Sequence, residues 1–278
     1  MTSPQSSPAR RAGRRPEPLA AKVPEITALF WVIKILTTGM GEATSDFLAK
    51  GNLVVAGVAG FAGFAVALWL QFRVRRYVAV VYWLAVAMVA VFGTMAADGL
   101  HVGLGIPYIV TTVFYAAVLA AVFILWHRSE GTLSIHSITT RRRETYYWLA
   151  VLATFALGTA TGDLTAMTLH LGFLASGILF TGLILVPAVA WWRFRLNPIA
   201  AFWWAYVLTR PLGASFADWL SKSHQLSGLN LGDGQVAAVS AVIIALLVAY
   251  VAIARNDIQP VVPVAPARTA RVPETEQA

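Results

Sequence analysis

The chain of 278 residues contains no cysteine, and only 12% of its residues are charged. The lack of cysteine excludes disulfide scaffolds, thiolate metal sites, covalently attached c-type haem and cysteine nucleophiles. An ordinary soluble domain has about 25% charged residues, whereas 58% of this chain is hydrophobic. Its uncharged stretches, such as 53–70 and 235–254, are long enough to cross a hydrocarbon layer about 30 Å thick. The composition therefore predicts an all-α, polytopic membrane protein, with the lipid bilayer as its first partner.

Polar clusters divide the apolar sequence into eight predicted membrane spans. We place these spans at 26–48, 53–72, 77–97, 106–126, 145–167, 171–192, 200–220 and 235–254. Of the 21 Lys and Arg residues, 17 fall on one side of the spans and two on the other, while Lys34 and Arg210 lie within spans. Because basic loops stay in the cytoplasm, both termini are expected there. The net charge of +8 is then explained by topology, so no nucleic-acid partner is expected.

The chain is expected to divide into five parts. Residues 1–21, rich in Pro, Ser and Arg, and residues 256–278, rich in Pro, Thr and Glu, are predicted to be disordered cytoplasmic tails. Residues 22–127 and 144–255 are the two halves of the membrane region, joined by the polar cytoplasmic linker 128–143. Tryptophan side chains are expected at the membrane–water interfaces, where aromatic belts form.

One pattern occurs four times along the chain. Each copy has an aromatic residue, Trp, nine further residues, Gly, four further residues and Asp. All four copies fall in odd-numbered spans, which predicts four two-helix repeats of parallel topology. The glycines are expected to let helix backbones approach closely. In order along the chain, the Trp, Gly and Asp positions are Trp31, Gly41 and Asp46; Trp83, Gly93 and Asp98; Trp148, Gly158 and Asp163; and Trp203, Gly213 and Asp218.

Several strings carry a family resemblance, among them Lys22-Val-Pro-Glu-Ile-Thr, Leu157-Gly158-Thr-Ala-Thr-Gly-Asp163 and Leu208-Thr209-Arg210-Pro211-Leu-Gly213-Ala. They resemble a bacterial inner-membrane protein family built from four tandem two-helix repeats of unknown function. The resemblance covers about residues 22–255 and implies this fold and an inner-membrane location, but no reaction. The chain departs from the family's pattern in its outward loops, where the glycine- and tyrosine-rich sequence is reduced.

Ionisable residues inside the spans are the candidate ion- or substrate-binding groups. They are Asp46, Asp98, Asp163 and Asp218 of the repeats, with Lys34 and Glu42 in the first repeat and Arg210 in the fourth. An Asp that follows its Trp by 15 helical residues lies about 22 Å further along, in the outer third of the membrane. Five carboxylates and two cations favour a cation or a proton as the travelling species. Alternatively, the aspartates have a structural role and cap the following helices or solvate turns.

Carboxylate ligands suit a hard divalent ion such as Mn²⁺ or Mg²⁺. Asp98, Asp163 and His101 are the candidate metal ligands, with a loop histidine as the alternative for His101. Pro211 follows Arg210 directly, and it is expected either to break the seventh span and expose backbone carbonyls or to kink it, with Arg210 paired to an aspartate.

The leading hypothesis is a small-solute transporter or exporter, with a cation as substrate and protons or the membrane potential as the driving force. The alternative is a non-transporting membrane sensor, chaperone or assembly module. An enzyme is not expected, because the chain has no HExxH, GxSxG or Walker-type glycine loop. No cofactor is expected, and the substrate and the oligomeric state are left open.

Overall fold

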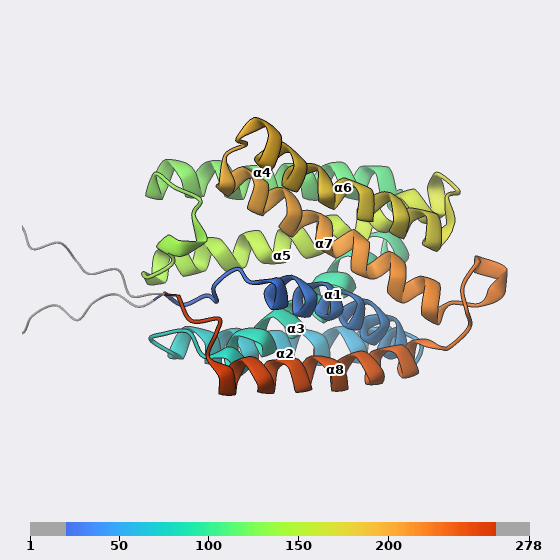
Figure 1. Cartoon of the computed structure of the whole chain (residues 1–278). Coiled ribbons are helices and arrows are strands. Elements are labelled where there is room, and N and C mark those ends of the chain that lie inside the picture. The colour runs from blue at the N-terminus through green and yellow to red at the C-terminus, as the bar shows by residue number, and fades with distance from the viewer. Residues whose placement is uncertain (1–20, 260–278) are drawn as a thin grey trace, which may run out of the picture.

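The computed structural model describes residues 21–259, which form eight long helices joined by short connections (Figure 1). Each of the eight predicted spans corresponds to one helix, with ends that agree to within about one helical turn. The predicted tails lie almost entirely outside the described residues. The helices are α1 (Ala28–Ala49), α2 (Leu53–Arg73), α3 (Ala79–Asp98), α4 (Tyr108–Glu130), α5 (Arg141–Asp163), α6 (Gly172–Phe194), α7 (Pro198–Ser221) and α8 (Asp233–Ala254).

Six of these helices are long and apolar enough to cross a membrane: α2, α3, α4, α5, α6 and α8. The chain is therefore a multi-pass membrane protein. The other two helices, α1 and α7, carry most of the ionisable residues of the repeats. Both begin with a capping side chain, since Thr27 accepts a hydrogen bond from the Phe30 N–H and Asn197 accepts one from the Ile199 N–H.

The odd-numbered helices form an inner ring in which α1 packs against α3, α3 against α5, α5 against α7, and α7 against α1 (Figure 1). Each even-numbered helix lies outside the ring, against the inner helix of the next repeat: α2 on α3, α4 on α5, α6 on α7, and α8 on α1. The two helices of one sequence repeat are therefore not the main packing pair. Burial follows this arrangement, because 67% of the α5 span is buried but only 17% of the α2 span.

The repeat glycines lie where neighbouring inner helices come closest, as the sequence predicted. A β-carbon added to Gly41 would lie 2.8 Å from the Ala90 carbonyl carbon, and one added to Gly213 would lie 2.7 Å from the Ile35 carbonyl oxygen. In every copy, the glycine meets the residue that follows the next repeat's Trp by seven positions. In order round the ring, these contacts are Gly41 with Ala90, Gly93 with Phe155, Gly158 with Arg210, and Gly213 with Thr38. The ring thus has a pseudo-fourfold arrangement.

The aromatic residues of the repeats pack together inside one end of the bundle. Trp83, Trp148 and Trp203 are at most 5% exposed, and the hydroxyls of Tyr82 and Tyr147 lie 2.5 Å apart. The prediction that the tryptophans form an interfacial belt is therefore wrong for these three. They lie on inner helices, whose faces are covered by neighbouring helices.

Helix α7 continues through Pro211, so the prediction of a broken seventh span is wrong. Proline removes one backbone hydrogen bond from the helix. The segment is nevertheless held on both sides by close packing, because Pro211 Cδ would lie 2.9 Å from a β-carbon at Gly158, and Gly213 abuts α1.

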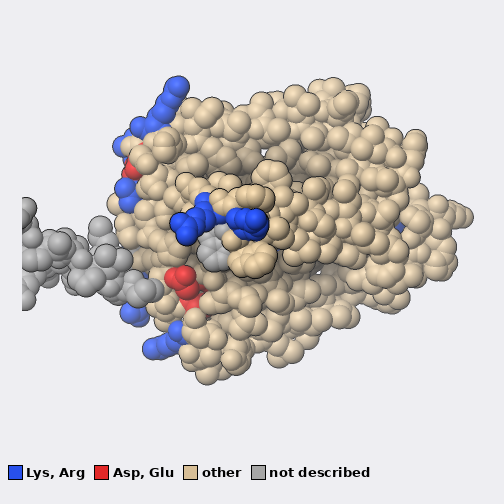
Figure 2. All heavy atoms as spheres, turned by 45° about the horizontal axis from the view of Figure 1, so that its top comes forward, with Lys and Arg blue, Asp and Glu red and all other residues tan. Residues whose placement is uncertain are grey.

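Lys and Arg gather at the end of the bundle where α1 begins and α8 ends (Figure 2). The turn after α2, the connection from α4 to α5 and the end of α6 supply these basic residues. The repeat aspartates lie toward the opposite ends of the inner helices. The bundle therefore has a basic, aromatic end and an acidic end.

Candidate functional site

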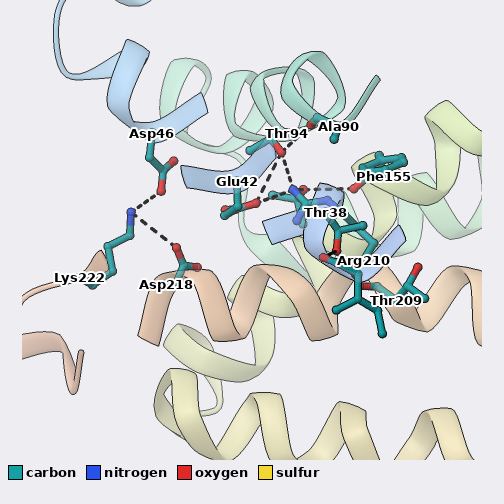
Figure 3. A network of polar contacts seen from close by, with 12 residues as sticks. Thr38, Glu42, Asp46, Ala90, Thr94, Phe155, Thr209, Arg210, Asp218 and Lys222 are labelled. Atoms are coloured by element: carbon teal, nitrogen blue, oxygen red, sulfur yellow. Dashed lines mark hydrogen bonds and ion pairs between the residues drawn. The ribbon is translucent and has the colours of Figure 1, made fainter. Parts of the chain in front are cut away.

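A single arginine contacts all three of the other inner helices at the centre of the ring. Arg210, on α7, is fully buried, and its Nη2 contacts the Glu42 carboxylate on α1, the Thr94 hydroxyl on α3, and the Thr159 hydroxyl on α5 at 2.6 Å (Figure 3). Glu42, Thr94 and Thr159 each follow their repeat's Trp by 11 residues. Because one guanidinium reaches the same position in three repeats, it lies on the pseudo-fourfold axis. Its ion-pair partner is Glu42 rather than an aspartate.

Lys34 is a second fully buried cation, closer to the aromatic end. Its Nζ donates a hydrogen bond to the Thr209 hydroxyl at 3.2 Å and lies 4.3 Å from the ring centroids of both Phe155 and Tyr206. Among the described residues, no carboxylate lies within ion-pair distance of Lys34. The faces of two aromatic rings therefore lie where an ion pair would have a carboxylate.

Three carboxylates converge on the acidic side of Arg210. Glu42, Asp46 and Asp218 each offer an oxygen, and these oxygens all lie within 4.8 Å of one another. Glu42 and Asp46 are one turn apart on α1, and Asp218 faces them from α7, the neighbouring inner helix. We call these three residues the carboxylate triad. Asp218 is 4% exposed and, within residues 21–259, accepts no hydrogen bond.

Lys222, at the C-terminal cap of α7, reaches into the triad. Its Nζ forms an ion pair with Asp46 and lies 3.6 Å from Asp218 Oδ1 (Figure 3). It also donates a hydrogen bond to Asp233 Oδ1 at 3.2 Å. Burial lowers the pKa of Lys222, but the negative charges of Asp218 and Asp46 outweigh burial and hold the pKa above its ordinary value. The lysine is therefore charged and neutralises part of the triad.

Sequence reasoning missed three groups of this site. Lys222 is one of the two basic residues predicted on the non-cytoplasmic side of the spans, and its spacing of four residues from Asp218 places the two on one helix face. Thr94 and Thr159 occupy the same repeat position as Glu42, and this shared position could have identified them from the sequence. With Lys222 included, five carboxylates and three cations leave a formal excess of two negative charges.

Asp98 and Asp163 end α3 and α5 and are half-buried. The chain continues from each of them into a π-helical turn, Gly99–Gly103 and Leu164–Thr168, a feature often found at functional sites. Neither aspartate belongs to the triad. Their binding of an ion, and of a metal in particular, stays a prediction.

His101 lies in the first of these π-helical turns. Its Nδ1 is 2.7 Å from the Ile106 carbonyl oxygen, and its ring stacks on Tyr108. One ring nitrogen is therefore engaged by the backbone, and the metal-ligand role of His101 also stays a prediction. The structural alternative of helix capping finds no support in the part of the chain described, because no repeat aspartate side chain accepts a backbone N–H and α2 is capped by Asn52.

The fold and the site define a multi-pass helical membrane protein with ionisable residues at the centre of a four-repeat ring. Comparison of the sequence with protein-family models agrees with this class. Residues 29–77, 81–132, 146–197 and 201–257 match the family described as Repeat of Unknown Function (DUF347). These segments take in one two-helix repeat each, and the chain belongs to this family. No curated protein and no solved structure matched the chain.

Proposed function

We propose that the protein is an inner-membrane transporter or exporter of a cation, without enzymatic activity. The observation that carries this proposal is the carboxylate triad between α1 and α7, in which Glu42 and Asp218 are buried and Asp46 is partly buried. Buried ionisable groups in a membrane protein are costly and commonly mark an ion pathway. The three carboxylates of the triad outnumber their two paired cations, Arg210 and Lys222, and a travelling cation or proton neutralises the remaining negative charge.

All eight helices cross the membrane in this proposal, with both termini in the cytoplasm. Although α1 and α7 are not among the six helices that are long and apolar enough to cross a membrane, their glycine contacts occur at the same repeat positions as those of α3 and α5. This symmetry supports the same depth for all four inner helices. The basic end of the bundle supports a cytoplasmic position for that end.

Passage of an ion requires the ring to change conformation. In the structure, the triad is separated from the aromatic end by Arg210 and then Lys34. Arg210 contacts α1, α3 and α5 at once, so a shift of α7 that breaks these contacts opens the centre. Glu42 then loses its guanidinium partner and becomes free to bind a cation.

Flux into proteoliposomes tests the proposal. The purified chain is reconstituted, and uptake of a panel of monovalent and divalent cations is measured under a pH gradient and under a membrane potential. We expect uptake of one cation class, which Asp98→Asn/Asp163→Asn abolishes although the variant stays folded in the membrane. Asp257→Asn is the matched control, because Asp257 lies at the basic end, hydrogen-bonded to Tyr77. Unaltered flux in the double variant would reject the role of these aspartates.

One observation favours the alternative of a non-transporting module. Arg210 joins all four inner helices through one side chain, as a static scaffold also requires. This alternative predicts no cation flux from the wild-type chain and a specific protein partner in crosslinking experiments. Flux that depends on the repeat aspartates excludes it.

A further inference from the structure

We propose that the carboxylate triad is a binding site for a hard divalent cation, and that Lys222 is an internal cation that occupies the site when no metal is bound. The inference rests on the proposed function for its role in transport. It narrows the proposed substrate to a hard divalent cation, and it makes Lys222 a competitor of that cation for the triad.

The spacing of the triad fits one ion. Calcium binds oxygen ligands at about 2.4 Å, so two oxygens on opposite sides of it lie about 4.8 Å apart. The triad oxygens are all within 4.8 Å of one another, so their spacing suits such an ion once Arg210 has released Glu42 and Lys222 has released Asp46. The smaller Mg²⁺ binds oxygen at about 2.0–2.1 Å, so its ligand oxygens lie closer together than those of Ca²⁺. Because all three ligands are carboxylates, the site favours hard ions over soft ones.

Asp218 independently indicates a missing ligand. Its carboxylate is buried, points into the triad, and accepts no hydrogen bond from the described residues (Figure 3). Its ion-pair contact with Lys222 Nζ, at 3.6 Å, is too long for a hydrogen bond. A buried carboxylate that lacks hydrogen bonds is unfavourable in its ionised form unless a cation binds it directly, and otherwise it takes up a proton. A metal ion in the triad supplies that interaction.

Lys222 is placed to exchange with such an ion. Its ammonium already contacts Asp46 and Asp218, where it stands in for a bound cation. The side chain is 22% exposed and lies just beyond the end of α7, so it can move without disturbing the helix. Asp233 lies 3.2 Å from Nζ and is also paired with Lys50. When a metal enters, Lys222 releases Asp46 and Asp218 and keeps Asp233 as its partner.

Binding of Mn²⁺ to the full chain in detergent tests this inference without a transport assay. Free Mn²⁺ is measured by electron paramagnetic resonance, with Mg²⁺ and Ca²⁺ as competitors. We expect one saturable site in the wild type, at least tenfold weaker binding in Asp218→Asn and Asp46→Asn, and at least tenfold tighter binding in Lys222→Met. Asp257→Asn is the control and should bind within twofold of the wild type. Gel filtration and thermal melting confirm that each variant is folded, and Lys222→Gln replaces Lys222→Met if the latter is not.

The outcomes separate the inference from the proposed function. Absence of Mn²⁺ binding in both wild type and Lys222→Met, equal binding in Asp218→Asn and wild type, or weaker binding in folded Lys222→Met overturns the inference. Binding as expected without cation flux upholds this site and rejects the transporter. Flux that is insensitive to Asp218→Asn and to divalent ions upholds a transporter and rejects this site.

Discussion

Replacing Gly213 by alanine is expected to destabilise the folded bundle. The added β-carbon would lie 2.7 Å from the Ile35 carbonyl oxygen and 3.0 Å from Thr38 Cβ. The first of these atoms belongs to the backbone of α1, so α1 and α7 must separate to accept it. Overpacking of this kind costs about 1–3 kcal/mol, while the alanine itself gains about 0.5–1 kcal/mol in a helix. The net expected loss is therefore at most about 2.5 kcal/mol.

Gly182→Ala is the matched control, because a β-carbon at Gly182 of α6 meets nothing within 4 Å. That variant is expected to be neutral or more stable by up to about 1 kcal/mol. The free energy of unfolding is measured by titrating the purified protein with SDS in mixed micelles. Gly41→Ala, which meets the Ala90 backbone, should behave like Gly213→Ala. If all three alanine variants are equally stable, the ring does not close through its glycines.

Three further predictions concern the buried cations and the topology. Arg210→Met is expected to lower the free energy of unfolding by about 3–5 kcal/mol, because it leaves Glu42 buried without its partner. The double variant with Glu42→Gln should lose less stability than the sum of the two single variants. Additive losses in SDS titration would argue against the ion pair. Lys34→Met is expected to be neutral or stabilising, since Lys34 has no carboxylate partner among the described residues; a large loss in the same titration would mean that its aromatic contacts stabilise the bundle. Because the chain has no cysteine, Arg75→Cys should react with an impermeant thiol reagent only from the cytoplasmic side and Gln225→Cys only from the outside; labelling of both from one side contradicts the topology.

The helices were predictable because apolar stretches and polar breaks set their ends directly. The repeat pattern also predicted the close glycine contacts, since a glycine that recurs at the same position of every repeat is expected to have the same packing role in each repeat. The pattern could not show that each outer helix packs on the next repeat's inner helix. That arrangement depends on how the helices close into a ring. The sequence pattern of a repeat is the same whether its outer helix packs on its own inner helix or on the inner helix of the next repeat.

The candidate site was predictable in its composition but not in its grouping. Glu42, Asp46 and Asp218 were recognised as intramembrane acids, but their convergence follows from the contact between α1 and α7, which are far apart in the sequence. One of the two alternatives for Arg210 paired it with an aspartate. It pairs instead with Glu42, because its side chain crosses the ring at the level of the Thr94 hydroxyl. Neutral threonines give no charge signal, so only their repeat offset could have identified them.

The tryptophans show the limit of composition rules in such a bundle. Trp is typical of membrane interfaces, and Trp192 is 79% exposed, as that rule expects. Trp126 and Trp148 are buried instead, because the helices around them cover the faces on which they lie. A rule for single helices therefore fails for residues that face other helices.

Charge movement through the reconstituted protein tests the central claim most directly. Proteoliposomes adsorbed to a solid-supported membrane are exposed to a jump in divalent or monovalent cation concentration, and the resulting current is recorded. The account predicts a saturable current in the wild type that is lost in Asp46→Asn/Asp218→Asn and retained in Asp257→Asn. A wild type that gives no current with any cation or with a proton gradient, while its melting shows a folded protein, contradicts the account and favours a non-transporting membrane module.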